Sequence, residues 1–112
     1  MSDLLPTHVL VAAARTRAQA ADAFIYIRQR GDADRGTILV KLNDLAGRHS
    51  LHRQIWDGAQ RRFEKIAEGE EAKLEDSIAA EARFDRDLWI IEIEDREGRL
   101  FFDTIFHESA AI

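Results

Sequence analysis

Cysteine is absent from this chain of 112 residues. Its absence excludes disulfide bonds, thiolate zinc sites, iron–sulfur clusters and a cysteine nucleophile. Small secreted domains often rely on disulfides, so a reducing compartment is favoured. The length fits one domain, and hydrophobic residues make up 46% of the chain. We therefore expect residues 1–112 to form a single domain whose core lies within about 7–102, followed by a tail at 103–112.

Long hydrophobic runs and the usual catalytic motifs are also missing. The apolar stretch at residues 4–14 is interrupted by Pro6 and His8 and is far too short to span a bilayer. Its leader, Met1-Ser2-Asp3, lacks the cationic residues of a signal peptide, so we expect a cytoplasmic protein without membrane contact. The sequence contains no phosphate loop, dinucleotide fingerprint, nucleophile elbow or zinc-protease motif. These absences predict no cofactor and no catalytic residue.

The formal net charge is −5, and it is unevenly distributed. Residues 1–56 carry eight Lys/Arg against five Asp/Glu, a net of +3, whereas residues 57–112 carry eight against sixteen, a net of −8. The two halves either present patches to oppositely charged partners or fold against each other and partly neutralise. Overall acidity argues against non-specific nucleic-acid binding, which depends on phosphate neutralisation.

Hydrophobic periodicity predicts an α+β fold. Short connections favour antiparallel pairing, so we expect an antiparallel sheet of about five strands with two helices packed on one face. Four strands would form a meander, and a C-terminal strand or hairpin would follow, with a polar turn at 95–99 leading into residues 100–102. The expected helices cover residues 7–20 and 70–83, and the expected strands cover residues 23–30, 37–43, 48–56, 60–67 and 88–94.

The alternation of apolar and acidic residues assigns the two faces of the strand at 88–94. Trp89, Ile91 and Ile93 alternate onto one face and should lie at the centre of the core. Glu92 and Glu94 fall on the other face, and Asp95 follows directly. Carboxylates two residues apart on a strand can share a divalent cation, which makes these three acids weak metal candidates. The competing interpretation is the solvated end of a strand, so we predict no metal site.

Basic residues gather around the first two strands. Tyr26, Arg28, Arg30, Arg35 and Lys41 could form a patch for an anion or a single-stranded nucleic acid. They could equally pair with the acidic residues of the adjacent loop or of the second helix.

Large aromatic residues near the expected edges and ends are candidates for an interface. They are Trp56, Phe101, Phe102 and Phe106. A homodimer could form around a two-fold axis through an exposed sheet edge or through residues 100–106.

Three segments resemble a known family. They are residues 36–43, residues 62–65 and residues 83–99, of which Leu88-Trp89-Ile90-Ile91-Glu92-Ile93-Glu94-Asp95 is the most specific. They resemble the short bacterial proteins grouped as domain of unknown function 1491. Arg86 stands where the resemblance leads us to expect proline, and the tail 103–112 is longer than usual. The resemblance implies a bacterial cytoplasmic protein and brings no activity, cofactor or catalytic residue.

We therefore expect a small non-enzymatic module that binds another protein or itself. One alternative is a small metal-dependent enzyme or ligand-binding protein that uses Glu92 and Glu94. The other is an RNA-associated protein that uses the Tyr26, Arg28 and Arg30 strand face.

Overall fold

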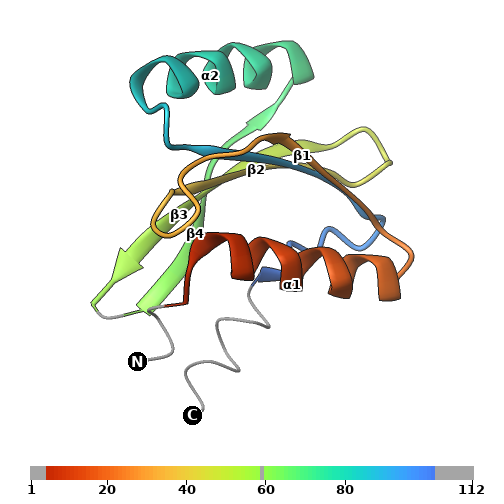
Figure 1. Ribbon diagram of the computed structural model, residues 1–112. Helices are drawn as coiled ribbons and strands as arrows, with labels where there is room; N and C mark the ends of the chain where they lie inside the picture. The colour runs from red at the N-terminus through yellow and green to blue at the C-terminus, as the bar shows by residue number, and fades with distance from the viewer. Residues whose placement is uncertain (1–4, 59, 103–112) are drawn as a thin grey trace.

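Figure 1 shows the computed structural model, which describes residues 5–58 and 60–102. The helices and strands lie close to the ranges expected from periodicity. In chain order they are α1 (Thr7–Ala20), β1 (Phe24–Gln29), β2 (Ile38–Asn43), β3 (His49–Asp57), β4 (Gln60–Gly69), α2 (Glu71–Phe84) and β5 (Trp89–Glu94). Within the described residues, neither helix has the length and apolar character needed to cross a lipid bilayer.

The five strands form one sheet in the order β1-β5-β2-β3-β4. β5 lies between β1 and β2, antiparallel to β1 and parallel to β2, and the remaining pairs are antiparallel. The expected four-strand meander is therefore wrong in part, because only β2, β3 and β4 pair in succession. α2 supplies the long crossover that a parallel strand pair requires, and it carries the chain back to the middle of the sheet.

The two helices cover opposite faces of the sheet (Figure 1), which corrects the expectation that they share one face. The physical reason is β5, which is apolar on both sides. Trp89, Ile91 and Ile93 are buried on the side of α1, whereas Leu88 and Ile90 are buried on the side of α2. A central strand with two apolar faces needs cover on each of them.

The larger core lies on the α1 side. Trp89 is 1% exposed, and Ile91 and Ile93, which share its face of β5 as predicted, are fully buried. Its indole Nε1 donates a hydrogen bond to the Asp32 carbonyl at 2.7 Å. Gly36 allows this close approach, because a Cβ there would lie 2.7 Å from Cδ1 of Trp89. The loop between β1 and β2 is thus held against the ring.

The smaller core lies on the α2 side. Leu74 and Ile78 recur at a spacing of four residues and form the buried stripe of α2. They pack in one cluster with Leu88 and Ile90 and with residues Leu39 and Leu51 of β2 and β3. This contact covers one part of the sheet face and leaves the start of β1 exposed.

The chain after β5 differs from the expected hairpin. Leu100 and Phe101 form no strand. Phe101 and Phe102 instead turn into the α1-side core, where the Phe102 ring lies 5.1 Å from the ring of Phe63. Residues 103–112, including Phe106, lie outside the described residues.

Candidate functional site

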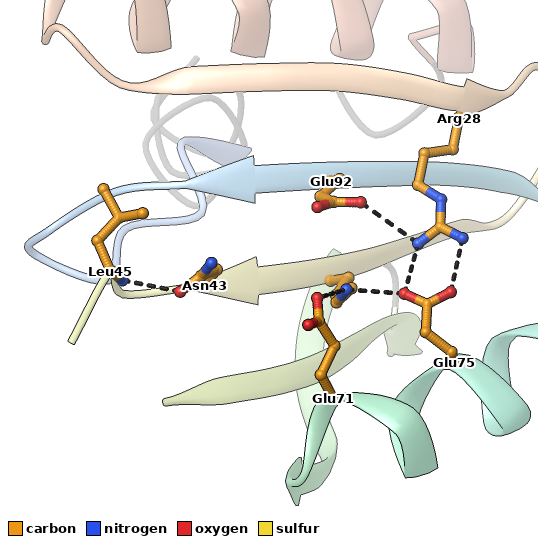
Figure 2. A network of polar contacts seen from close by, with 7 residues as sticks. Arg28, Asn43, Leu45, Glu71, Glu75 and Glu92 are labelled. Atoms are coloured by element: carbon orange, nitrogen blue, oxygen red, sulfur yellow. Dashed lines mark hydrogen bonds and ion pairs between the residues drawn. The ribbon is translucent and has the colours of Figure 1, made fainter. Parts of the chain in front are cut away.

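A network of ion pairs joins α2 to the strands β1, β2 and β5 (Figure 2). Lys41 of β2 has a side chain only 3% exposed, and its Nζ donates to Glu71 at 2.5 Å and to Glu75 at 2.7 Å. Arg28 of β1 donates to both carboxylate oxygens of Glu75, at 2.8 and 2.9 Å, and reaches Glu92 of β5 at 3.4 Å. Three strands are therefore linked to one turn of the helix through charged groups.

These contacts shift the pKa values of Lys41 and Glu75. Burial by itself lowers the pKa of Lys41, but the hydrogen bonds that Lys41 donates to Glu71 and Glu75 outweigh this effect, and the pKa is raised. The hydrogen bond from Arg28 dominates at Glu75 and lowers the pKa of that carboxyl to about 2. A lysine held protonated is neither a nucleophile nor a general base. The network therefore holds α2 against the sheet through charged groups.

The three acids considered as metal ligands have separate roles. Glu92 belongs to the network, and Asp95 is 4% exposed in the turn after β5. Arg99 donates to both oxygens of Asp95 at 2.9 Å, and its hydrogen bonds lower the pKa of that carboxyl. Glu94 lies beside β1, opposite Phe24. Across residues 5–58 and 60–102, no three His, Asp or Glu side chains are grouped so that they could hold a metal ion.

The predicted basic patch is divided between the two faces. Arg28 and Lys41 share the α2 side with Tyr26, but both cations are paired with carboxylates. Of the two interpretations of these basic residues, the structure therefore shows pairing with the acidic helix for Arg28 and Lys41. A β-bulge in β1 shifts the register, so that Arg30 lies over the ring of Trp89, 5.1 Å from its centre, on the α1 side.

The remaining candidates from the predicted basic patch and the predicted interface lie in different parts of the structure. Arg35 lies in the loop after β1 and lines a pocket together with Trp56, whose residue is 55% exposed. Phe101 and Phe102 are buried, so these two rings pack in the core and are not available to a partner. They belong to the same buried cluster as the small residues Ala14 and Ala18 of α1.

A surface of which the sequence predicted only Tyr26 lies at the start of β1. Phe24 and Tyr26 are 59% and 48% exposed, and their rings stack at 6.3 Å with an angle of 10° between the planes. Leu45, in the turn after β2, is 50% exposed and lines a hollow of about 350 Å³ with Phe24 and Glu94. We call Phe24, Tyr26 and Leu45 the open aromatic surface.

Carboxylates border this surface. In the register of β1 and β5, Phe24 pairs with Glu94 and Tyr26 pairs with Glu92. The alternation of the two rings in the sequence was a usable signal, because residues two apart on a strand share a face. The position of Leu45 had no such signal, since it depends on a turn in which Leu45 has a φ of 62°.

Comparison with known proteins gives one family and matching structures. The sequence matches the family described as "Protein of unknown function (DUF1491)" over residues 5–103. The crystal structure of a DUF1491 family protein from Caulobacter crescentus CB15 is similar, with a TM-score of 0.79 and 36% identity over 88% of this chain and 92% of that chain. The solution structure of protein Atu0922 from A. tumefaciens has a TM-score of 0.72 and 31% identity, over 81% and 86% of the two chains. No curated protein matches the sequence.

Proposed function

The chain belongs to the DUF1491 family of proteins of unknown function, and on that premise we propose that it is a non-enzymatic protein-interaction module of the cytoplasm. Its partner is an extended cationic segment of another protein, which docks along β1. One observation carries this proposal: two stacked aromatic rings are half exposed on an edge strand. The lack of cysteine supports a reducing compartment.

The choice of β1 follows from comparing the two edges of the sheet. β4 forms one edge and carries alternating charges, which discourage pairing with another strand. β1 forms the other edge, and its sequence Phe24-Ile25-Tyr26-Ile27-Arg28-Gln29 contains no acidic residue. An extended segment can add to such an edge through main-chain hydrogen bonds, while its alternate side chains meet the face of the sheet.

The charge of the docking segment follows from the residues next to the rings. Glu94 borders Phe24, and Glu92, which pairs with Arg28, borders Tyr26. The hollow beside Phe24 is lined by four acidic residues and two arginines, and the whole chain has a net charge of −5. A segment that alternates apolar and cationic residues would place its apolar groups on the rings and its cations beside the carboxylates. A nucleic acid would bring phosphates to the same carboxylates, so this surface does not favour RNA.

The same charges revise the expected homodimer. Phe101 and Phe102 are buried, so these two rings of the 100–106 segment are not available to a second copy, whereas an exposed sheet edge such as β1 is. Two copies paired there would each bring a border containing Glu92 and Glu94, which disfavours self-pairing. The surface therefore suits a cationic segment better than a second copy.

A pair of synthetic peptides tests the proposal. The first is a ten-residue peptide that alternates lysine and valine, and the second has glutamate in place of every lysine. Titration followed by NMR should give a dissociation constant of about 0.1–1 mM for the lysine peptide, with shifts concentrated on the amides of β1. The glutamate peptide should not bind.

Matched variants identify the surface. Replacing both rings, Phe24→Ser with Tyr26→Ser, should weaken binding of the lysine peptide by about tenfold or more. Val9→Ser is the control, because Val9 is an exposed apolar residue on α1, away from β1. Equal binding of the two peptides, or unchanged binding by the double variant, would contradict the proposal.

A further inference from the structure

A second hollow lies on the α1 side of the sheet, where three distant segments of the chain meet. It has a volume of about 640 Å³, which is within the range of small-molecule sites. Its walls come from the residue before α1, from the loop that precedes β2, and from the hairpin of β3 and β4. The residues that line it are Pro6, Asp34, Arg35, Thr37, Gln54, Trp56 and Arg61.

Gln54 is a nearly buried amide in the lining of this hollow. Its residue is 8% exposed, and its Oε1 accepts a hydrogen bond from the backbone N–H of Ile38 at 3.2 Å. That contact fixes which end of the amide faces the backbone, so the two N–H groups of Nε2 face elsewhere. An amide of a residue that lines the hollow can donate a hydrogen bond to an anionic group placed there.

Positive charge and an aromatic ring complete the lining. Arg61 is 6% exposed, and its guanidinium lies 5.3 Å from the centre of the Trp56 ring. Arg35 lines the same hollow from the loop, and Asp34 is the acidic residue among the described residues that line it. The half-exposed indole of Trp56 offers a flat apolar surface beside these cations.

We infer that this hollow binds a small organic anion in which a phosphate or carboxylate is joined to a flat ring. The anionic group is held by Arg35, Arg61 and the amide of Gln54, and the ring packs against Trp56. Such a site lies apart from the open aromatic surface, so it does not depend on the protein partner proposed above.

Calorimetric titration with defined probes tests the site. Adenosine monophosphate and benzoate combine a ring with an anionic group, whereas adenosine and inorganic phosphate each carry one of the two. At least one combined probe should bind with a dissociation constant of about 1 mM or lower, and about tenfold more tightly than either half. Binding of adenosine monophosphate alone would indicate a phosphate ligand, and binding of benzoate alone a carboxylate ligand.

Three variants localise the binding. Gln54→Glu keeps an oxygen for the Ile38 N–H but replaces the donor by a negative charge, and Arg35→Gln removes a loop cation. Each of these two variants should weaken binding of the combined probe by about tenfold. Arg83→Gln removes the same charge from the exposed end of α2 and should leave the affinity unchanged. Because Arg35 lies in a loop, its variant keeps the test decisive even where Gln54→Glu fails to fold.

Several results would overturn the inference. One is that neither combined probe binds at 10 mM, a concentration at which a site of about millimolar affinity is nearly saturated. Another is that inorganic phosphate alone binds as tightly as a combined probe. An equal loss of affinity in Arg83→Gln would show that the overall charge, and not this hollow, holds the anion.

Discussion

Lys41 keeps its charge in a nearly solvent-free position, and its surroundings make that position stable. Glu71 and Glu75 accept its hydrogen bonds, while Arg28 shares Glu75 and reaches Glu92. Removing one member of such a group leaves another charge buried without full compensation. At the scale of single residues, this network is an electrostatic constraint on where α2 lies.

Glu75→Gln tests that constraint through its pH dependence. The folded-state pKa of Glu75 is lowered from an ordinary 4.5 to about 2. Its ionised form therefore contributes stability that is present above pH 4.5 and lost as the pH falls towards 2. Because the side chain is 37% exposed, we expect Glu75→Gln to lower the free energy of unfolding by only about 1 kcal/mol at pH 7.

Chemical denaturation at pH 7 and at pH 3 measures this difference. The gap between wild type and Glu75→Gln should shrink at the lower pH, whereas the exposed control Glu64→Gln should show little change at either pH. A gap that stays constant across this range would show that the carboxylate does not act through its charge.

At the scale of single elements, β5 decides the architecture. Periodicity predicts each helix and strand near its observed bounds, because side-chain alternation is a local property of the sequence. Pairing is not local, and the insertion of β5 between β1 and β2 depends on how α2 crosses the sheet. Its second apolar face, formed by Leu88 and Ile90, is the feature of the sequence that favours a central position with cover on both sides.

The candidate surface was less predictable than the elements that carry it. The alternation of Phe24 and Tyr26 is visible in the sequence, but their exposure depends on which part of the sheet α2 covers. Arg30 illustrates the same limit, since one bulge in β1 moves it to the opposite face. A register shift of one residue reverses every later side chain, and the sequence of β1 does not mark it.

Trp89→Ala measures how strongly β5 supports the fold. The ring is 1% exposed and central to the α1-side core, and removing a buried aromatic of this size costs about 3–5 kcal/mol. The control is Trp56→Ala, which removes a half-exposed indole and should cost less than about 1 kcal/mol. Thermal melting of both variants compares them directly, and a Trp89→Ala protein that melts within a few degrees of wild type would contradict this role of β5.

At the scale of the whole molecule, the uneven charge is used within the chain. Ion pairs between α2 and the sheet each join a cation from residues 1–56 to an acid from residues 57–112. The pairs are Arg28 with Glu75, Lys41 with Glu71 and Glu75, and Arg53 with Glu81. The two halves therefore partly neutralise each other, which is one of the two interpretations that the charge distribution allowed. The acidic excess that remains includes Glu94, beside the open aromatic surface.

This remaining charge predicts how the protein associates with itself. Pairing of two β1 edges around a two-fold axis would bring two acidic borders together, on molecules that each carry a net charge of −5. We expect a monomer at low salt and at most weak dimerisation at high salt, where screening reduces the repulsion. Sedimentation equilibrium in both buffers, with the Phe24→Ser and Tyr26→Ser double variant as control, measures this. A dimer that is stable at low salt and lost in the double variant would make a second copy the occupant of β1, and would contradict a cationic partner.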